Sequence, residues 1–183
     1  MAAGVVAATY GHALFELAVE QDEIDSLVTE ADTILEIFRD NPEFERLLAH
    51  PRIDVEQKLV IIDQCFRGKL SDDMTGFLSV VVKNGRQNEI CASLADFKRE
   101  VKEYRHIGVC TVTSALPLPE EQKKRLTARL IETTAYESFE MNYVVDAKLI
   151  GGLTVRIGDR VLDSSIKSQL NGLKKSLQAL SVE

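Results

Sequence analysis

Histidine and cysteine are the side chains of this sequence best suited to bind a metal or to act as nucleophiles. A zinc site needs several of them close together, commonly as CxxC or HxxxH pairs. No such pair exists, and no GxSxG motif accompanies a serine. The histidines and cysteines are widely spaced: His12, His50, His106, Cys65, Cys91 and Cys110. The spacing therefore predicts neither a metal site nor a catalytic triad.

Three glycines, Gly151, Gly152 and Gly158, could form a loop that binds phosphate. A phosphate loop, however, needs a Lys-Ser/Thr pair at Walker spacing or a GxGxxG run, and the sequence has neither. A glycine pair at the start of a strand is more typical of a bulge or of a close backbone approach. We therefore predict a structural role for these glycines and expect no bound cofactor.

Paired acidic residues could act as general acid and base, but their positions favour another interpretation. Asp22-Glu23, Asp72-Asp73 and Glu120-Glu121 all lie where a helix is expected to start, and carboxylates there stabilise the helix dipole. The basic cluster of Lys123, Lys124, Arg125 and Arg129 is typical of a solvated helix face. No tryptophan accompanies it, so base stacking is not indicated. None of these groups resembles an active site.

Composition and charge limit the remaining classes of function. The chain is 45% hydrophobic and 28% charged, which is enough apolar material for a core. Residues 1–105 hold 12 basic and 20 acidic side chains, whereas residues 106–183 hold 10 and 9. An acidic first half gains nothing from phosphates, so we expect no nucleic-acid partner. Unpaired cysteines, the absence of a basic leader and the lack of an apolar run of about 18 residues predict a cytoplasmic protein.

Apolar residues recur at three- and four-residue steps throughout the first 105 residues, which predicts helices. Breaks are expected at Asn41-Pro42, Pro51, Gly68 and Asn84-Gly85, and Asn41 is expected to cap a short helix over Glu43–Ala49. Six helices with short connections predict a compact antiparallel bundle.

The second half follows a different pattern, in which β-branched and apolar residues alternate with polar ones. A helix is expected from Glu120, and a terminal amphipathic helix is expected to be capped by Asp163 or Ser164. The predicted strands are Val109–Ala115, Phe139–Val145, Leu149–Ile157 and Arg160–Leu162. The predicted fold is therefore α+β: a six-helix bundle over residues 1–105, followed by a small α/β domain over residues 106–183.

Surfaces for helical partners are the functional features that remain. Tyr10, Ala13, Leu14 and Leu17 combine small and large side chains and could receive a helix, although bundle core is the commoner explanation for each of them taken singly. A second stripe, from Ile166 to Leu180, repeats with the 4-3-4-3 spacing of a coiled-coil face. Packing on the sheet is the favoured interpretation for its first positions, whereas Leu177 and Leu180 are the better candidates for an exposed surface.

The order of residues in Val145–Ile166, VDAKLIGGLTVRIGDRVLDSSI, resembles the signature of the delta subunit of F-type ATP synthases, the counterpart of the mitochondrial oligomycin-sensitivity-conferring protein. The stretch Tyr10–Ala18 looks like the opening helix of that family. His50-Pro51-Arg52-Ile53 and Asn84-Gly85-Arg86 are also similar to family motifs. The chain departs from the pattern at Ser164, where many members have glycine. The resemblance covers nearly the whole chain.

The resemblance implies a non-catalytic subunit of the peripheral stalk. In the family, the N-terminal bundle binds N-terminal segments of the alpha subunits, and the C-terminal domain contacts the C-terminal ends of the b subunits. Such a stator resists rotational torque, so that proton flow stays coupled to ATP synthesis. The expected location is the cytoplasmic face of a bacterial inner membrane, reached only indirectly through the complex.

Family analogy also places the alpha-binding surface on the first and fifth helices. A free-standing helical adaptor, or less favourably a small enzyme with its site in the C-terminal domain, remains as an alternative. The candidate partner-binding residues are Tyr10, Ala13, Leu14, Leu17, Phe77, Leu78 and Val81 in the bundle, and Leu177 and Leu180 near the C-terminus.

Overall fold

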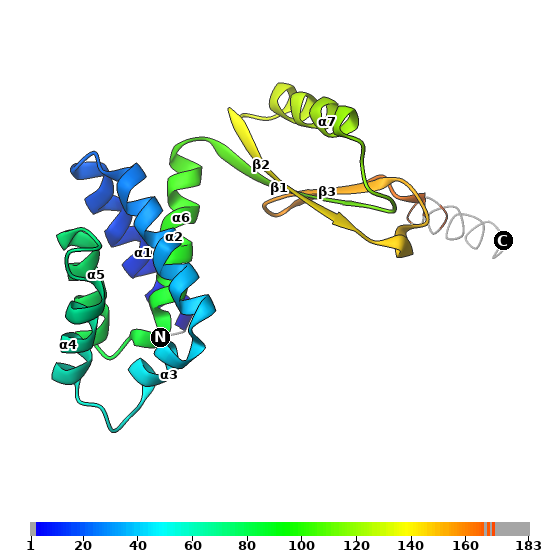
Figure 1. The fold of residues 1–183 in the computed structure, drawn as a ribbon. Helices are drawn as coiled ribbons and strands as arrows, with labels where there is room; N and C mark the ends of the chain where they lie inside the picture. The colour runs from blue at the N-terminus through cyan, green and yellow to red at the C-terminus, as the bar shows by residue number, and fades with distance from the viewer. Residues whose placement is uncertain (1–2, 167, 169, 171–183) are drawn as a thin grey trace, which may run out of the picture. The chain divides into compact units, whose positions relative to one another are not determined.

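The computed structural model of the protein describes residues 3–166, 168 and 170 (Figure 1). The chain divides into two compact units, residues 1–101 and residues 102–183. The first unit is helical, and the second combines helix with a four-stranded sheet. The predicted α+β class, with a helical bundle followed by a small α/β part, is confirmed.

The first unit consists of the six predicted helices with short connections. Helices end where the backbone cannot continue them: α3 stops before Pro51, and the chain after α4 reaches Gly68 with a φ of 75°. A 3-10 turn, η1 (Gln87–Glu89), precedes the last helix. The helices are α1 (Ala3–Glu20), α2 (Ile24–Asp40), α3 (Pro42–Ala49), α4 (Val55–Phe66), α5 (Asp72–Lys83) and α6 (Ile90–Tyr104).

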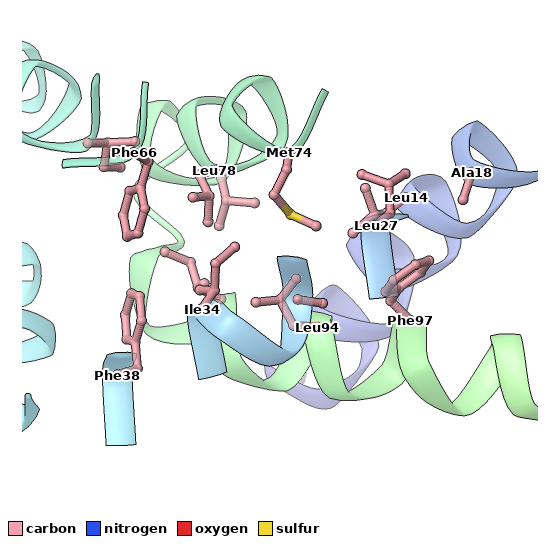
Figure 2. Packing of buried hydrophobic residues seen from close by; sticks show 14 of the residues in the cluster. Leu14, Ala18, Leu27, Ile34, Phe38, Phe66, Met74, Leu78, Leu94 and Phe97 are labelled. Atoms are coloured by element: carbon pink, nitrogen blue, oxygen red, sulfur yellow. The ribbon is translucent and has the colours of Figure 1, made fainter. Parts of the chain in front are cut away.

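One apolar core holds the six helices together. On α2 the buried side chains recur every three or four residues, so that they form one stripe along the helix. Figure 2 shows Met74 and Leu78 of α5 pointing toward the side chains of the neighbouring helices. Burial of these large side chains removes apolar surface from water and is the main stabilising term of the bundle. The core includes Leu14, Leu27, Ile34, Leu48, Ile62, Met74, Leu78, Val81, Leu94 and Phe97.

Hydrogen bonds at the helix ends set where α2 and α5 meet. Ser71 caps α5, because its hydroxyl accepts the Met74 backbone N–H at 3.2 Å. The Glu30 carboxylate of α2 accepts both the Ser71 hydroxyl, at 2.7 Å, and the Ser71 N–H, at 3.0 Å. Asn41 stands at the N-cap position of α3, as predicted, but its side chain makes no capping hydrogen bond there. The side-chain amide donates instead to the Ile37 carbonyl at the end of α2.

The second unit contains a mixed sheet with strand order β2-β1-β3-β4. Strands β1 and β2 are parallel and are joined through helix α7, as a parallel pair requires, while β3 and β4 form an antiparallel hairpin. One side of the sheet carries the buried side chains Cys110, Val112 and Val155, which pack with Leu130 of α7. The elements are β1 (Ile107–Ser114), α7 (Glu120–Thr133), β2 (Ser138–Val145), β3 (Leu153–Ile157) and β4 (Arg160–Asp163).

The strand predicted over Leu149–Ile157 is shorter in the structure, because residues before Leu153 form a turn. A 3-10 turn, η2 (Ala147–Leu149), starts where the Asp146 carboxylate accepts the Lys148 backbone N–H at 2.9 Å. Ile150 then has a φ of 64°, which no strand residue adopts. The glycine pair therefore follows a tight turn and precedes β3.

Helices of the described residues are all too short or too polar to cross a membrane.

Candidate partner-binding surfaces

The structure separates the predicted candidates on α1 and α5 into two groups. Ala13 is exposed, and Tyr10, Leu17 and Phe77 are half-buried, so these four side chains leave surface accessible to solvent. The other three lie in the core, with exposed fractions of 1% or less, and they contribute to a binding surface only by supporting it from beneath: they are Leu14, Leu78 and Val81.

A hydrogen bond shows that α1 and α5 are neighbours. The Asn84 side-chain amide, just after α5, donates to the Tyr10 hydroxyl of α1 at 3.0 Å. The same sides of the two helices carry further apolar or small residues that sequence reasoning missed. Helical steps from Tyr10 and Phe77 would have found them. We call this set the α1–α5 surface: Val6, Tyr10, Ala13, Leu17, Gly76, Phe77 and Val80.

Carboxylates lie beside the α1–α5 surface at both helices. Asp73 is one turn before Phe77 on α5, and Glu20 is one turn after Leu17 on α1. Val80 of α5 is 51% exposed. The surface is therefore apolar, with a carboxylate one helical turn away on each helix.

The opposite side of α1 packs closely on α6. A Cβ atom built on Gly11 would lie 2.7 Å from the Ser93 carbonyl oxygen and 2.9 Å from the Phe97 nitrogen. Next to this contact, His12 Nδ1 lies 2.8 Å from a Glu100 carboxylate oxygen, and its Nε2 lies 3.4 Å from Glu16. The hydrogen bond to Glu100 and the charges of both carboxylates raise the pKa of His12 above its usual value.

The His12–Glu100 pair predicts a pH-dependent contribution to the stability of the bundle. Because the pKa of His12 is raised on folding, its contribution is fully present below the unfolded-state pKa of about 6.5 and is lost as pH rises through the folded-state value. We therefore expect His12→Gln to lower the melting temperature at pH 5.5–6 and to change it little at pH 9. Melting curves across this range test it, with Glu100→Gln as the partner variant. A pH-independent difference would contradict it.

Hollows in the bundle lie away from the α1–α5 surface. One, of about 440 Å³, is lined by residues of α2, α3 and α4, including Phe44, Leu47 and Phe66. Another, of about 490 Å³, lies along α4 around Val60. A helix that packs on a helix pair needs a ridge-and-groove match of side chains and no deep cavity. The position of the hollows therefore does not argue against the α1–α5 surface.

In the second unit, Asp163 at the end of β4 locks the start of the final helix to the sheet. Its carboxylate accepts the Ser168 hydroxyl at 2.6 Å and the Ser165 backbone N–H at 2.8 Å. These bonds, with smaller contributions from the Ser165 and Thr154 side chains, lower the pKa of Asp163 to about 2. The buried Ser165 hydroxyl in turn accepts the Ser168 N–H at 3.2 Å. The predicted cap at Asp163 or Ser164 therefore needs correction, because Ser165 is the capping residue and Asp163 supports it.

The glycine pair allows residues 164–166, at the start of the helix, to pack against the turn before β3. Gly152 has a φ of 78°, and a Cβ atom there would lie 2.4 Å from the Ser164 carbonyl oxygen. The turn and the helix start are also joined by backbone bonds, from the Ile166 N–H to the Gly151 carbonyl and from the Ser164 N–H to the Leu153 carbonyl, each 3.0 Å. The predicted close backbone approach is confirmed, and its partner is the start of the terminal helix.

Exposed apolar side chains surround this lock. Leu162 at the sheet edge and Ile150 in the turn are both about two-thirds exposed, and Ile166 and Leu170 are exposed on the helix that follows. Such a patch is typical of a protein-binding site. The predicted residues Leu177 and Leu180 lie outside the described residues.

Several ionisable side chains in the described part of the chain are buried or engaged by neighbouring residues. Burial raises the pKa of the Cys91 and Cys110 thiols, which keeps them protonated and poorly nucleophilic. Among the described residues, no three His, Cys, Asp or Glu side chains are close enough to hold a metal ion. The carboxylates of Asp163 and Glu120 are engaged by neighbouring serines and by Lys123.

Two units that each expose an apolar helix or sheet-edge surface are typical of a subunit that binds other proteins. Comparison with known proteins is consistent with this class. The model of the ATP synthase delta (OSCP) subunit family matches residues 6–177. The chain therefore belongs to the ATP synthase delta (OSCP) subunit family.

Individual relatives agree with the family assignment. The chain is 45% identical over 175 residues to the ATP synthase subunit delta of Lachnoclostridium phytofermentans, covering 96% of each protein. It is 36% identical over 172 residues to the subunit delta of Halalkalibacterium halodurans, covering 94% of each. A chain in the mitochondrial ATP synthase of Toxoplasma gondii has the same fold, with a TM-score of 0.72 at 19% identity, over 94% of this chain and 97% of that one.

Proposed function

We propose that this chain is a non-catalytic stator subunit of a bacterial F-type ATP synthase, which links the catalytic head to the peripheral stalk. Membership of the delta (OSCP) family over residues 6–177, which span both units, is the observation that carries the proposal. The comparisons do not favour a free-standing adaptor. The chain would then act at the cytoplasmic face of the inner membrane through the complex, without entering the bilayer.

The two units suit two different partners. The bundle is strongly acidic and presents the α1–α5 surface, which fits an apolar and basic helical segment such as the N-terminus of an alpha subunit. The second unit is nearly neutral and carries the exposed apolar patch around Leu162 and Ile166, which fits the C-terminal end of the b subunits. We propose the division at residues 105 and 106 as the boundary between these two roles.

In this role the chain itself catalyses no reaction. Rotation of the central shaft exerts torque on the catalytic head, and the stator must hold the head still for ion flow to produce ATP. The test is reconstitution: purified heads and membranes are stripped of this subunit, and the purified chain is added back. Restored coupled ATP synthesis supports the proposal, and unchanged uncoupling by correctly folded protein would refute it.

Ala13 provides the residue-level prediction for the bundle. It is exposed between Tyr10 and Leu17, so Ala13→Glu adds bulk and a negative charge to an acidic, apolar surface without disturbing the core. We expect the affinity for a synthetic peptide of the alpha N-terminus to fall at least about tenfold, which corresponds to roughly 1.4 kcal/mol. Isothermal titration calorimetry measures the change.

The matched control for Ala13 is Thr33→Glu, which places the same charge on an exposed position of α2. It alters the net charge equally but leaves the α1–α5 surface intact. We expect it to bind the peptide nearly as well as the unmodified chain. An unchanged affinity in Ala13→Glu would place the alpha-binding site elsewhere on the bundle.

A further inference from the structure

Gly76 is a glycine that the fold itself does not require. It lies in the interior of α5, it is exposed, and a Cβ atom added there would meet nothing within 4 Å. Glycine is the least favourable residue in a helix interior after proline. Gly11, in contrast, is explained by its close contact with α6. Within the described residues, therefore, no contact compensates for the helix stability that is lost by having glycine at position 76.

The neighbours of Gly76 show which way this bare stretch of backbone faces. Val80, one turn later, is half exposed, and Phe77 is half-buried beside it. Two turns after Gly76, Asn84 reaches α1 through its hydrogen bond to Tyr10. Positions 76 and 80 are neighbours one turn apart on the helix, and positions 80 and 84 are neighbours in the same way. Gly76 thus adjoins Val80, an exposed apolar side chain of the α1–α5 surface.

We propose that Gly76 is the point where the backbone of a bound helix comes closest to α5, which makes it a specificity-determining residue of the α1–α5 surface. Helices approach one another most closely where one of them lacks a side chain, since the distance between axes depends on the side chains at the contact. This inference rests on the proposed function, in which the occupant is the N-terminal segment of an alpha subunit.

The charges beside Gly76 define the chemistry of that helix. Asp72 and Asp73 lie one turn before Gly76 on α5, and Glu20 extends the acidic margin on α1. The surface is complementary in both shape and charge to one kind of helix. That helix has a small residue against Gly76, apolar side chains over Phe77 and Val80, and Lys or Arg toward these carboxylates. A neutral or acidic amphipathic helix satisfies only the shape.

The test uses the full chain with Gly76→Ala and Gly76→Leu. Both residues favour helix, and the space is open, so the melting temperature should rise or stay unchanged. Affinity for the synthetic alpha N-terminal peptide should fall about threefold for Ala and at least about tenfold for Leu, because the added side chain holds the bound helix away. A purely structural glycine would not separate stability from binding in this way.

Thr33→Leu on α2 is the control for added bulk, because Thr33 is exposed and lies outside the α1–α5 surface. It should bind the peptide like the unmodified chain. Full affinity in Gly76→Leu, together with weakened binding in Ala13→Glu, would overturn the role of Gly76 and leave the surface in place. No binding by the unmodified chain would refute the alpha-binding proposal itself, and with it this inference.

Discussion

Replacing Gly152 with alanine should unfold or loosen the second unit while leaving the bundle folded. The residue has a φ of 78°, and an added Cβ would lie 2.4 Å from the Ser164 carbonyl oxygen and 2.9 Å from the Ser165 Cα. Strain in the left-handed region alone costs about 1–3 kcal/mol, and the contact with rigid backbone adds to it. We expect a total loss of about 3–4 kcal/mol in the free energy of unfolding of this unit.

Hydrogen exchange resolved by residue measures this loss, because amides of β1 and β3 should lose protection while those of α2 and α6 keep it. Gly158→Ala is the matched control: its φ is 55°, but nothing lies within 4 Å of its added Cβ. This control should cost only the strain, about 1 kcal/mol. Equal losses in the two variants would show that the close approach to Ser164 contributes nothing.

The contact between Gly152 and the start of the helix should also affect binding to the stalk. Asp163, Ser165 and Gly152 hold the start of the helix at Ile166 against the sheet, and the exposed apolar side chains of Leu162 and Ile166 lie beside that point. Gly152→Ala should therefore weaken association with the stalk and leave peptide binding at the bundle intact. Loss of both activities would argue that the two units do not act separately.

Gly11→Ala should destabilise the bundle by about 2 kcal/mol, although alanine is the better helix former. The added Cβ would lie 2.7–3.0 Å from the Ser93 carbonyl, the Phe97 nitrogen and the Asp96 Cβ of α6. Because two of these atoms belong to the backbone, α1 must move away from α6 as a whole. Overpacking of this kind costs about 1–3 kcal/mol, which exceeds the gain of up to about 1 kcal/mol in helix propensity.

Urea unfolding followed by far-ultraviolet circular dichroism tests this prediction, and Gly76→Ala supplies the matched control. Both variants make the same chemical change in the interior of a helix, so their propensity gains are similar. Gly76 has open space and should gain stability, whereas Gly11 should lose it. A gain at both positions would mean that α1 adjusts to the extra carbon without cost.

Helix and strand positions followed from local patterns, because burial repeats along a helix or strand with a period that the sequence shows directly. The stripe of Leu27, Ile34 and Phe38 and the alternation of β1 are examples. The pattern failed where side chains compete with the backbone. The Asp146 side chain starts a 3-10 turn where a strand was predicted, and the Asn41 side chain bonds to the end of α2 rather than capping α3.

The sequence by itself determined the family resemblance, the division into helical and α/β parts and the close approach at the glycine pair. Only the tertiary structure decided which residues of α1 and α5 stay accessible to solvent. Leu14 and Tyr10 are one turn apart, yet one is buried and the other reaches Asn84, since neighbouring helices decide which flank of an apolar stripe stays open. The hydrogen bonds between Glu30 and Ser71 and the close packing of Gly11 on α6 likewise join distant parts of the chain, and such contacts leave no local periodicity to detect.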